Sequence, residues 1–334
     1  MTLTLREFLR SKHALHSAVE SNVLDELLIA DLEAYGEEWS PAERRRTTVY
    51  VVCLILIWIA LLYFDEVVLL KPDFIFWSKV LIQNFFMALV FLACGYSVIF
   101  CRLNEGYSRK ICHVFAYMLP ILLHVLWSAR KYDTDSRFPS SVELTWTCWV
   151  QFFPFLALVK PIRRKSRFLM VIFRAIDRQK DRPYTLTWMT SQLVGNYVAI
   201  LIVHSYLASQ EDYRRANLAI LPMLVNVFGD GLAEPVGIRW GKNKYTTCAV
   251  WHNGMFCAGK FERSYEGSAC VYFVTLIALV PFYSIFTVSQ FTLSVIFLPL
   301  TTTLCEAWAP HTWDNPFLTM VCGVFFMLIF ETIP

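Results

Sequence analysis

Residues 268–309, SACVYFVTLIALVPFYSIFTVSQFTLSVIFLPLTTTLCEAWA, contain a single charged side chain, that of Glu306. A helix needs about 20 consecutive apolar residues to cross the hydrocarbon core of a bilayer. The stretch is therefore long enough for two spans, at 268–287 and 290–309, separated by a short turn. It predicts either a pair of membrane-spanning helices or one re-entrant hairpin.

The same pattern recurs along the 334-residue chain, which is 56% hydrophobic. Soluble globular chains are roughly 45–50% apolar. Seven further apolar spans are expected, at roughly 47–64, 78–101, 111–127, 144–161, 187–207, 216–236 and 316–331. The sequence thus predicts an all-α, polytopic bundle of about nine transmembrane helices. The net charge is only +3 and the basic residues lie in short loops, so no nucleic-acid partner is indicated.

The distribution of Lys and Arg predicts the orientation of this bundle, because cytosolic loops carry an excess of both residues. With nine spans and a cytosolic N-terminus, twenty Lys and Arg side chains from Arg44 onward fall on the cytosolic side and seven on the other. Residues 1–43 are then a cytosolic amphipathic region and 44–104 form the first transmembrane helices. Residues 105–334 form the remaining domain, with a cytosolic loop at 237–267.

The segment before and within this loop, Asn226–Ser268, combines acids, glycines and cations. Asp230 and Glu234 precede Arg239, Lys242, Lys244, Lys260 and Arg263. Carboxylates hold a divalent cation, whereas cations and glycine backbone amides hold phosphates. The arrangement therefore suits a metal–nucleotide complex. The alternative is a basic cytosolic loop with a topological role only.

Asn226, Asp230 and Glu234 are spaced by four residues, which predicts one helix face with an amide and two carboxylates. An acid inside a membrane span is a functional candidate by default, although an acid at the end of a span can also lie at the interface. Gly229 and Gly231 would allow a ligand to approach the backbone closely. Pro235 and Gly237 predict the end of the helix.

Three further segments carry polar groups. His113 in Tyr107–His113 is either a general base or a hydrogen-bonded interfacial histidine. The basic run Pro161–Pro183 predicts an amphipathic helix on anionic lipid. RSYEGS (Arg263–Ser268) opens a span with serine, glycine and free amides, a typical anion site. Tyr107–His113, Asn226–Ser268 and Glu306–Asn315 are expected on the same, cytosolic face of the membrane. The basic run is expected to contact lipid and is not counted with them.

The order of these motifs resembles the polyprenol kinase family, the CTP-dependent membrane kinases of dolichol, phytol and farnesol. The resemblance rests on GDGLAEPVGIRWGKNKY, RSYEGS, the late glutamate, the DN pair at Asp314–Asn315 and the upstream SRKICH. It covers about residues 105–320. It extends distantly to phosphatidate cytidylyltransferases and CTP-dependent diacylglycerol kinases. Arg263 stands where the family usually has Lys, and the aromatic loop at 245–259 is longer than expected.

The resemblance implies a lipid kinase that uses CTP, Mg²⁺ and an isoprenoid alcohol. The Lys and Arg distribution predicts a site that faces the cytosol, and the endoplasmic reticulum is expected because residues 1–43 do not make a convincing transit peptide. Asp230, Glu306 and Asp314 would bind the metal, and Asp230, His113 and Glu234 would be catalytic. The nucleotide would contact a larger set: Gly229, Gly231, Arg239, Lys242, Lys244, Lys260, Arg263, Ser264, Glu266, Gly267 and Ser268. A homodimer is an open alternative. Cytidylyl transfer to phosphatidate and membrane transport are the competing functions.

Overall fold

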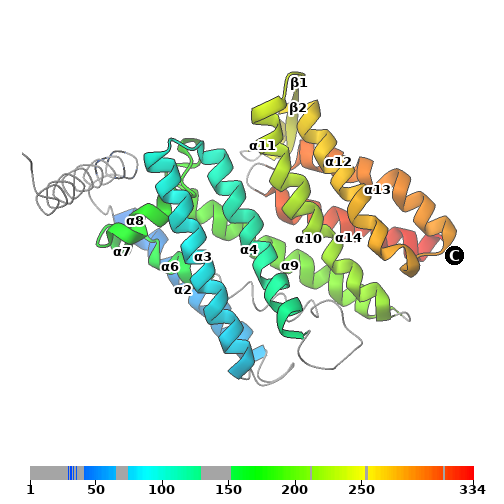
Figure 1. Cartoon of the computed structure of the whole chain (residues 1–334), viewed down its shortest axis with the longest axis horizontal. Coiled ribbons are helices and arrows are strands. Elements are labelled where there is room, and N and C mark those ends of the chain that lie inside the picture. The colour runs from blue at the N-terminus through cyan, green and yellow to red at the C-terminus, as the bar shows by residue number, and fades with distance from the viewer. Residues whose placement is uncertain are drawn as a thin grey trace, which may run out of the picture.

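The structure is a computed structural model, which describes residues 29, 31, 33, 35, 41–64, 74–128, 152–210, 213–252, 255–310 and 313–334. Most of these residues are helical (Figure 1). The longer helices are α2 (Pro41–Phe64), α3 (Phe74–Phe100), α4 (Glu105–Ser128), α9 (Thr185–Ala208), α11 (Gly231–Trp240), α12 (Tyr265–Leu279), α13 (Val288–Trp308) and α14 (Asp314–Thr332). Shorter segments are α6 (Phe152–Ala157), α7 (Lys160–Arg163), α8 (Arg167–Arg174), η2 (Gln179–Asp181), η3 (Tyr213–Ala219), α10 (Ile220–Leu224), η4 (Val225–Asp230) and η5 (Val280–Ile285).

Within the described ranges, six helical segments are long and apolar enough to cross a membrane. They are Trp77–Phe100, Thr185–Ala208, Arg214–Trp240, Tyr265–Ile285, Val288–Trp308 and Asp314–Thr332. The prediction of nine spans is therefore not met. Helices α2 and α4 cover the expected spans 47–64 and 111–127 but are not among the six, and most of 144–161 lies outside the described residues. Most of the predicted region 1–43 also lies outside them.

The one departure from an all-α fold among the described residues is an antiparallel hairpin of β1 (Lys244–His252) and β2 (Met255–Ser264). It occupies most of the expected loop 237–267 and stands beyond the ends of α11 and α12 (Figure 1). Threonine, valine and aromatic residues fill these strands, and such side chains favour extended backbone. The register shifts between Thr247 and Ala249, opposite the segment where Cys257 and Gly259 have positive φ angles of 49° and 78°.

The segment Arg214–Trp240 is the most enclosed of the six, with 72% of its apolar window buried against at most 44% in the others. Its backbone is a π-helix over Val225–Asp230, between α10 and α11. It continues through Pro235, and its last turn is closed by the Gly241 N–H, which donates to the Gly237 oxygen at 3.2 Å. The predicted end at Pro235–Gly237 was therefore wrong, and the helix ends at Trp240.

Two hydrophobic cores meet along α4 and α9. The first joins α10–α14 and includes Leu221, Val271 and Phe326, all fully buried. The second joins α3, α4, α8 and α9 and includes Ile176 and Tyr197. Helix α4 contributes Tyr117 to the first core and Cys112 to the second, so one helix packs into both.

Candidate functional site

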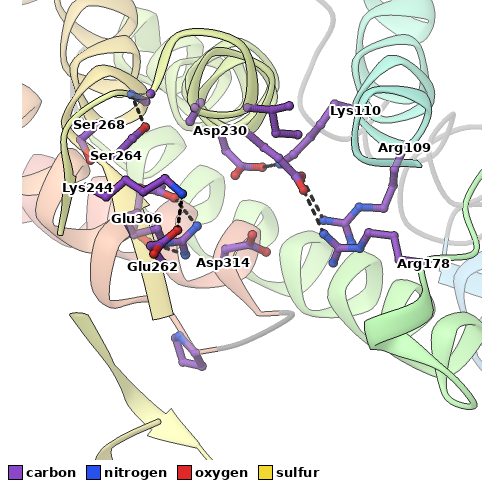
Figure 2. A pocket seen from close by; sticks show the side chains of 18 of the residues that line it. Arg109, Lys110, Arg178, Asp230, Lys244, Glu262, Ser264, Ser268, Glu306 and Asp314 are labelled. Atoms are coloured by element: carbon purple, nitrogen blue, oxygen red, sulfur yellow. Dashed lines mark hydrogen bonds and ion pairs between the residues drawn. The ribbon is translucent and has the colours of Figure 1, made fainter. Parts of the chain in front are cut away.

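A polar cavity of about 440 Å³ lies between the two cores, at the ends of α4, α11, α12, α13 and α14. Five basic and five acidic side chains line it: Arg109, Lys110, Arg178, Lys244 and Arg263 with Asp230, Glu234, Glu262, Glu306 and Asp314. Figure 2 shows these groups on two walls, with Lys110, Asp230, Arg109 and Arg178 facing Lys244, Glu262, Glu306 and Ser264, and Asp314 between them. We call this cavity the charged pocket.

The centre of the first wall is an ion pair between α4 and the π-helix. The Lys110 Nζ donates to Asp230 Oδ2 at 2.6 Å, and both residues are 5% exposed. Lys110 Nζ also lies 3.9 Å from Glu234 Oε2. A carboxylate this deeply buried is stable only when it is paired. Lys110 therefore balances the charge of Asp230.

Three segments converge next to this pair. Arg178, which lies just before η2, contacts Asp181 Oδ2 at 2.7 Å and Glu234 Oε1 at 3.3 Å. Arg109 contacts the same two acids, at 3.4 Å and 3.7 Å. Burial lowers the pKa of Arg109, and the neighbouring positive charge of Arg178 lowers it further. Two guanidinium groups are thus held side by side at the pocket by two carboxylates.

The second wall comes from the hairpin and from α12 and α13. Arg263 NH1 lies 3.0 Å from Glu306 Oε1, and Arg263 NH2 donates to the Glu306 backbone oxygen at 3.3 Å. Burial alone would lower the pKa of Arg263, but Glu306, Asp314 and Asp230 raise it, so the guanidinium stays charged. Lys244 and Glu262 form an exposed pair at 2.6 Å. The hairpin therefore carries cations to the pocket edge.

The start of α12 closes this wall. Ser264 is its N-cap and accepts a hydrogen bond from the Gly267 N–H at 3.1 Å. Glycines bring the surrounding backbones together: a Cβ on Gly267 would lie 2.8 Å from the Ala233 oxygen, and one on Gly241 would lie 2.4 Å from the Gly237 oxygen. Contacts this short are incompatible with any side chain. The glycines of the motif hence serve helix and hairpin packing.

A buried amide network lies behind the pocket. The Asn226 amide donates to Thr319 Oγ1 at 2.8 Å and to the Asn315 backbone oxygen at 3.2 Å. Thr319 Oγ1 in turn donates to Asn196 Oδ1 at 2.6 Å. Beside this network, the Gln192 amide donates to Asp314 Oδ1. Asn226 therefore ties the π-helix to α9 and α14, whereas Asp230 and Glu234 line the pocket.

Nine of the predicted site residues line the charged pocket, and seven do not. Those that line it are Asp230, Glu234, Lys244, Arg263, Ser264, Gly267, Ser268, Glu306 and Asp314. Those that do not are Gly229, Gly231, Arg239, Lys242, Lys260, Glu266 and His113.

The seven residues that do not line the pocket are either exposed or in contact with other parts of the structure. Arg239, Lys242 and Lys260 are exposed. Gly229 packs near Val225 and Val271, and Gly231 near Val114. One Glu266 oxygen accepts the backbone N–H groups of Lys242 and Asn243 at 3.1 and 3.2 Å, and His113 Nε2 lies 3.3 Å from the Asn226 backbone oxygen.

Sequence reasoning assigned no pocket role to Arg109, Lys110, Arg178, Gln192 and Glu262, all of which line the pocket. Arg109 and Lys110 could have been predicted, because they are the basic pair of the SRKICH motif. Arg178 belongs to the run that was predicted to lie on lipid. That prediction was wrong for its buried members, because Arg163 and Arg178 are 3% and 8% exposed and are paired with acids.

Among the described residues, no group of three or more His, Cys, Asp or Glu side chains is close enough to hold a metal ion. Asp230, Glu306 and Asp314 nevertheless line one pocket. Mg²⁺ is usually bound by one or two carboxylates together with substrate phosphates and water. The donor set thus fits a cation that is completed by phosphate oxygens, and it does not form a cage of its own.

The six apolar helices indicate an integral membrane protein. Comparison of the chain with protein-family models, with curated proteins and with solved structures found no match. The resemblance to the polyprenol kinases therefore stays a prediction from the motifs themselves.

Proposed function

We propose that this protein is an integral-membrane kinase that transfers the γ-phosphoryl group of CTP to an isoprenoid alcohol with Mg²⁺. The observation that supports this function best is the charged pocket, in which Lys110–Asp230 faces Arg263–Glu306 beside the N-terminus of α12. Phosphoryl transfer depends on positioning and charge neutralisation more than on covalent chemistry. The choice of CTP and of an isoprenoid acceptor follows the motif resemblance.

The cations on both walls would bind the triphosphate. Arg109 and Arg178 present two guanidinium groups on one wall, and Arg263 presents one on the other. Guanidinium groups bind phosphate oxygens with two parallel hydrogen bonds. Lys110 pairs with Asp230 and would turn to a phosphate where a divalent cation balances Asp230 instead.

The carboxylates divide into two groups. Glu234 and Glu306 contact arginines, so they would hold these cations in place. Asp230 would hold Mg²⁺ together with phosphate oxygens, and the ion would neutralise charge on the phosphates, so that Asp314 would remain free to accept a proton. In the reaction, the acceptor oxygen bonds to the γ-phosphorus and the bond from that phosphorus to the β–γ bridging oxygen breaks. CDP leaves, and the hydroxyl proton passes to Asp314.

This assignment replaces the two earlier candidates for the base. His113 lines a neighbouring, mostly apolar cavity and not the charged pocket, and its Nε2 atom lies 3.3 Å from the Asn226 backbone oxygen. Glu234 is within 4 Å of Arg109, Lys110 and Arg178. Asp314 contacts the Gln192 amide and lies between the two walls. We propose that the site faces the cytosol, on the distribution of Lys and Arg, and that the membrane is that of the endoplasmic reticulum.

The test uses the full chain in nanodiscs with radiolabelled CTP, Mg²⁺ and prenols of defined length. We expect a phosphorylated prenol and CDP. Asp230→Asn should abolish the product, and Glu331→Gln, an exposed acid at the other end of α14, should not change it. Undiminished product with Asp230→Asn would overturn the metal assignment. Pyrophosphate and a cytidylylated lipid from phosphatidate would establish cytidylyl transfer instead.

A further inference from the structure

A second cavity, of about 200 Å³, adjoins the charged pocket. Its lining is mostly apolar and comes from α3, α4, α6, α8 and α9, with Met87, Phe91, Phe155, Leu169, Ile172 and Met189 among the contributing side chains. Helices α3 and α9 contain two of the six apolar spans. We call this cavity the apolar chamber.

The apolar chamber and the charged pocket meet at the same residues. Arg109, Lys110, Gln192, Asp230 and Asp314 line both. A molecule with an apolar chain in the chamber would therefore present its polar end to the carboxylates of the pocket. The arrangement suits an amphiphile whose reacting group is at one end.

One buried polar atom at this junction lacks a hydrogen-bond partner among the described residues. Asn315 is 2% exposed and lines the chamber, and its Oδ1 atom accepts no hydrogen bond. Buried polar atoms are usually satisfied, and leaving one without a partner costs free energy. The adjacent residue is Asp314. A hydroxyl group at this point would donate its one hydrogen to Asn315 Oδ1 when the alcohol binds, and would turn it to Asp314, which also lines the chamber, for the transfer.

The size of the chamber limits what it can hold. A chain carbon with its hydrogens fills about the volume of one water in the liquid, ~30 Å³, so the chamber has room for about seven such groups. This is between one and two five-carbon isoprene units. Pro154 and Phe168 line the chamber and are exposed, so the rest of a chain can leave between α6 and α8.

We propose that the apolar chamber binds the first one to two isoprene units of a single-chain primary alcohol, with the hydroxyl donating to Asn315 Oδ1. The proposal rests on the proposed kinase function and adds which part of the acceptor is recognised. The part of the isoprenoid chain that extends beyond the chamber is surrounded by lipid in both the free and the bound alcohol, so it contributes little to the binding affinity. The protein therefore selects the alcohol by its head and not by its length.

The test measures lipid binding without nucleotide, so that it does not depend on catalysis. The full chain in nanodiscs is photolabelled with a ten-carbon isoprenoid alcohol that carries a diazirine, and the labelled residues are mapped by mass spectrometry. We expect label on residues that line the chamber, competed by unlabelled prenols. At equal mole fraction in the bilayer, competition should rise from five to ten carbons and then stay level. A hydrocarbon without the hydroxyl should not compete.

Variants on one helix separate the chamber from the general lipid surface. Ala88 lines the chamber on α3, and Ala93 is an exposed residue of the same helix that does not. Ala88→Phe should lower labelling about tenfold, or about 1.4 kcal/mol, because the added ring would fill part of the chamber that the alcohol occupies. Ala88→Leu should have a smaller effect and guards against misfolding. Ala93→Phe should leave labelling unchanged.

The outcomes distinguish this proposal from the proposed function. Two labelling results would overturn the chamber assignment, even if prenol kinase activity is found: label outside the chamber, or equal losses in Ala88→Phe and Ala93→Phe. Two competition results would also overturn it: competition that rises steadily up to long prenols, or stronger competition by diacylglycerol. Label in the chamber with loss in Ala88→Phe alone would support it. If no nucleotide then phosphorylates the bound alcohol, the kinase function fails and the alcohol site stands.

Discussion

Replacing Asp230 by Asn should destabilise the protein substantially, because it leaves the Lys110 ammonium buried beside a neutral amide. Both residues are 5% exposed and their charged atoms lie 2.6 Å apart. Removing one partner of a buried ion pair typically costs about 3–5 kcal/mol. Glu234 lies 3.9 Å from Lys110 Nζ and compensates in part. We therefore expect the lower end, about 3 kcal/mol, or roughly a hundredfold change in the unfolding equilibrium constant.

The double variant Lys110→Met/Asp230→Asn should recover most of this loss, because no uncompensated charge remains. A double-mutant cycle isolates the interaction, and we expect a coupling of at least about 2 kcal/mol. The assay is unfolding by SDS in mixed micelles, followed by tryptophan fluorescence. The control cycle uses Lys244 and Glu262, whose side chains are 55% and 65% exposed, and should give no more than about 1 kcal/mol. Additive losses at Lys110 and Asp230, or wild-type stability of Asp230→Asn, would refute the reasoning.

Three further variants test the two walls and the backbone around them. Arg263→Gln removes the partner of the buried Glu306 carboxylate and should weaken binding of a fluorescent CTP analogue more than tenfold. The control is Arg239→Gln at an exposed position, which should bind the analogue with nearly wild-type affinity. Equal losses of affinity would contradict the assignment of the nucleotide to the pocket. Gly241→Ala places a Cβ 2.4 Å from the Gly237 oxygen and should cost about 1–3 kcal/mol, seen as a lower melting temperature; an unchanged melting temperature would show that the hairpin can shift. Asn226→Leu removes the donor to three acceptors on α9 and α14 and should cost about 1–3 kcal/mol in the same assay; a neutral result would mean that the amide network does not hold the π-helix.

The sequence predicts the membrane-spanning helices well where apolar runs are uninterrupted, as in 290–309, which the structure places in α13. It fails at Lys244–Ser264. There the cations and glycines indicated a loop, whereas the segment pairs as two strands, with threonine, valine and aromatic residues in β1 and two phenylalanines in β2. The preference of Thr246, Thr247, Val250 and Trp251 for extended backbone is local and is interrupted by charged residues and glycines, so it does not stand out in the sequence.

The site was predictable in its acids and less so in its cations. Asp230 and Glu306 follow from acids placed in apolar runs, because such acids are rare without a function. Lys260 was expected at the phosphates. It is exposed on β2, nearer the turn of the hairpin than the pocket-lining Glu262 and Arg263, because the extended strand holds it away from them. Arg178 joins the pocket only through the tertiary contact between η2 and α4, which no local pattern reveals.

The π-helix at Val225–Asp230 sets the rotational phase of everything that follows it in the span. An α-helix advances about 100° per residue. A substitution that made these residues α-helical instead of π-helical, with their number unchanged, would leave the span long and apolar enough for the membrane. It would also turn α11 by about that angle and point Glu234 away from Arg109 and Arg178. Insertion into the bilayer and assembly of the charged pocket are hence separately encoded, and a chain can retain the first while losing the second.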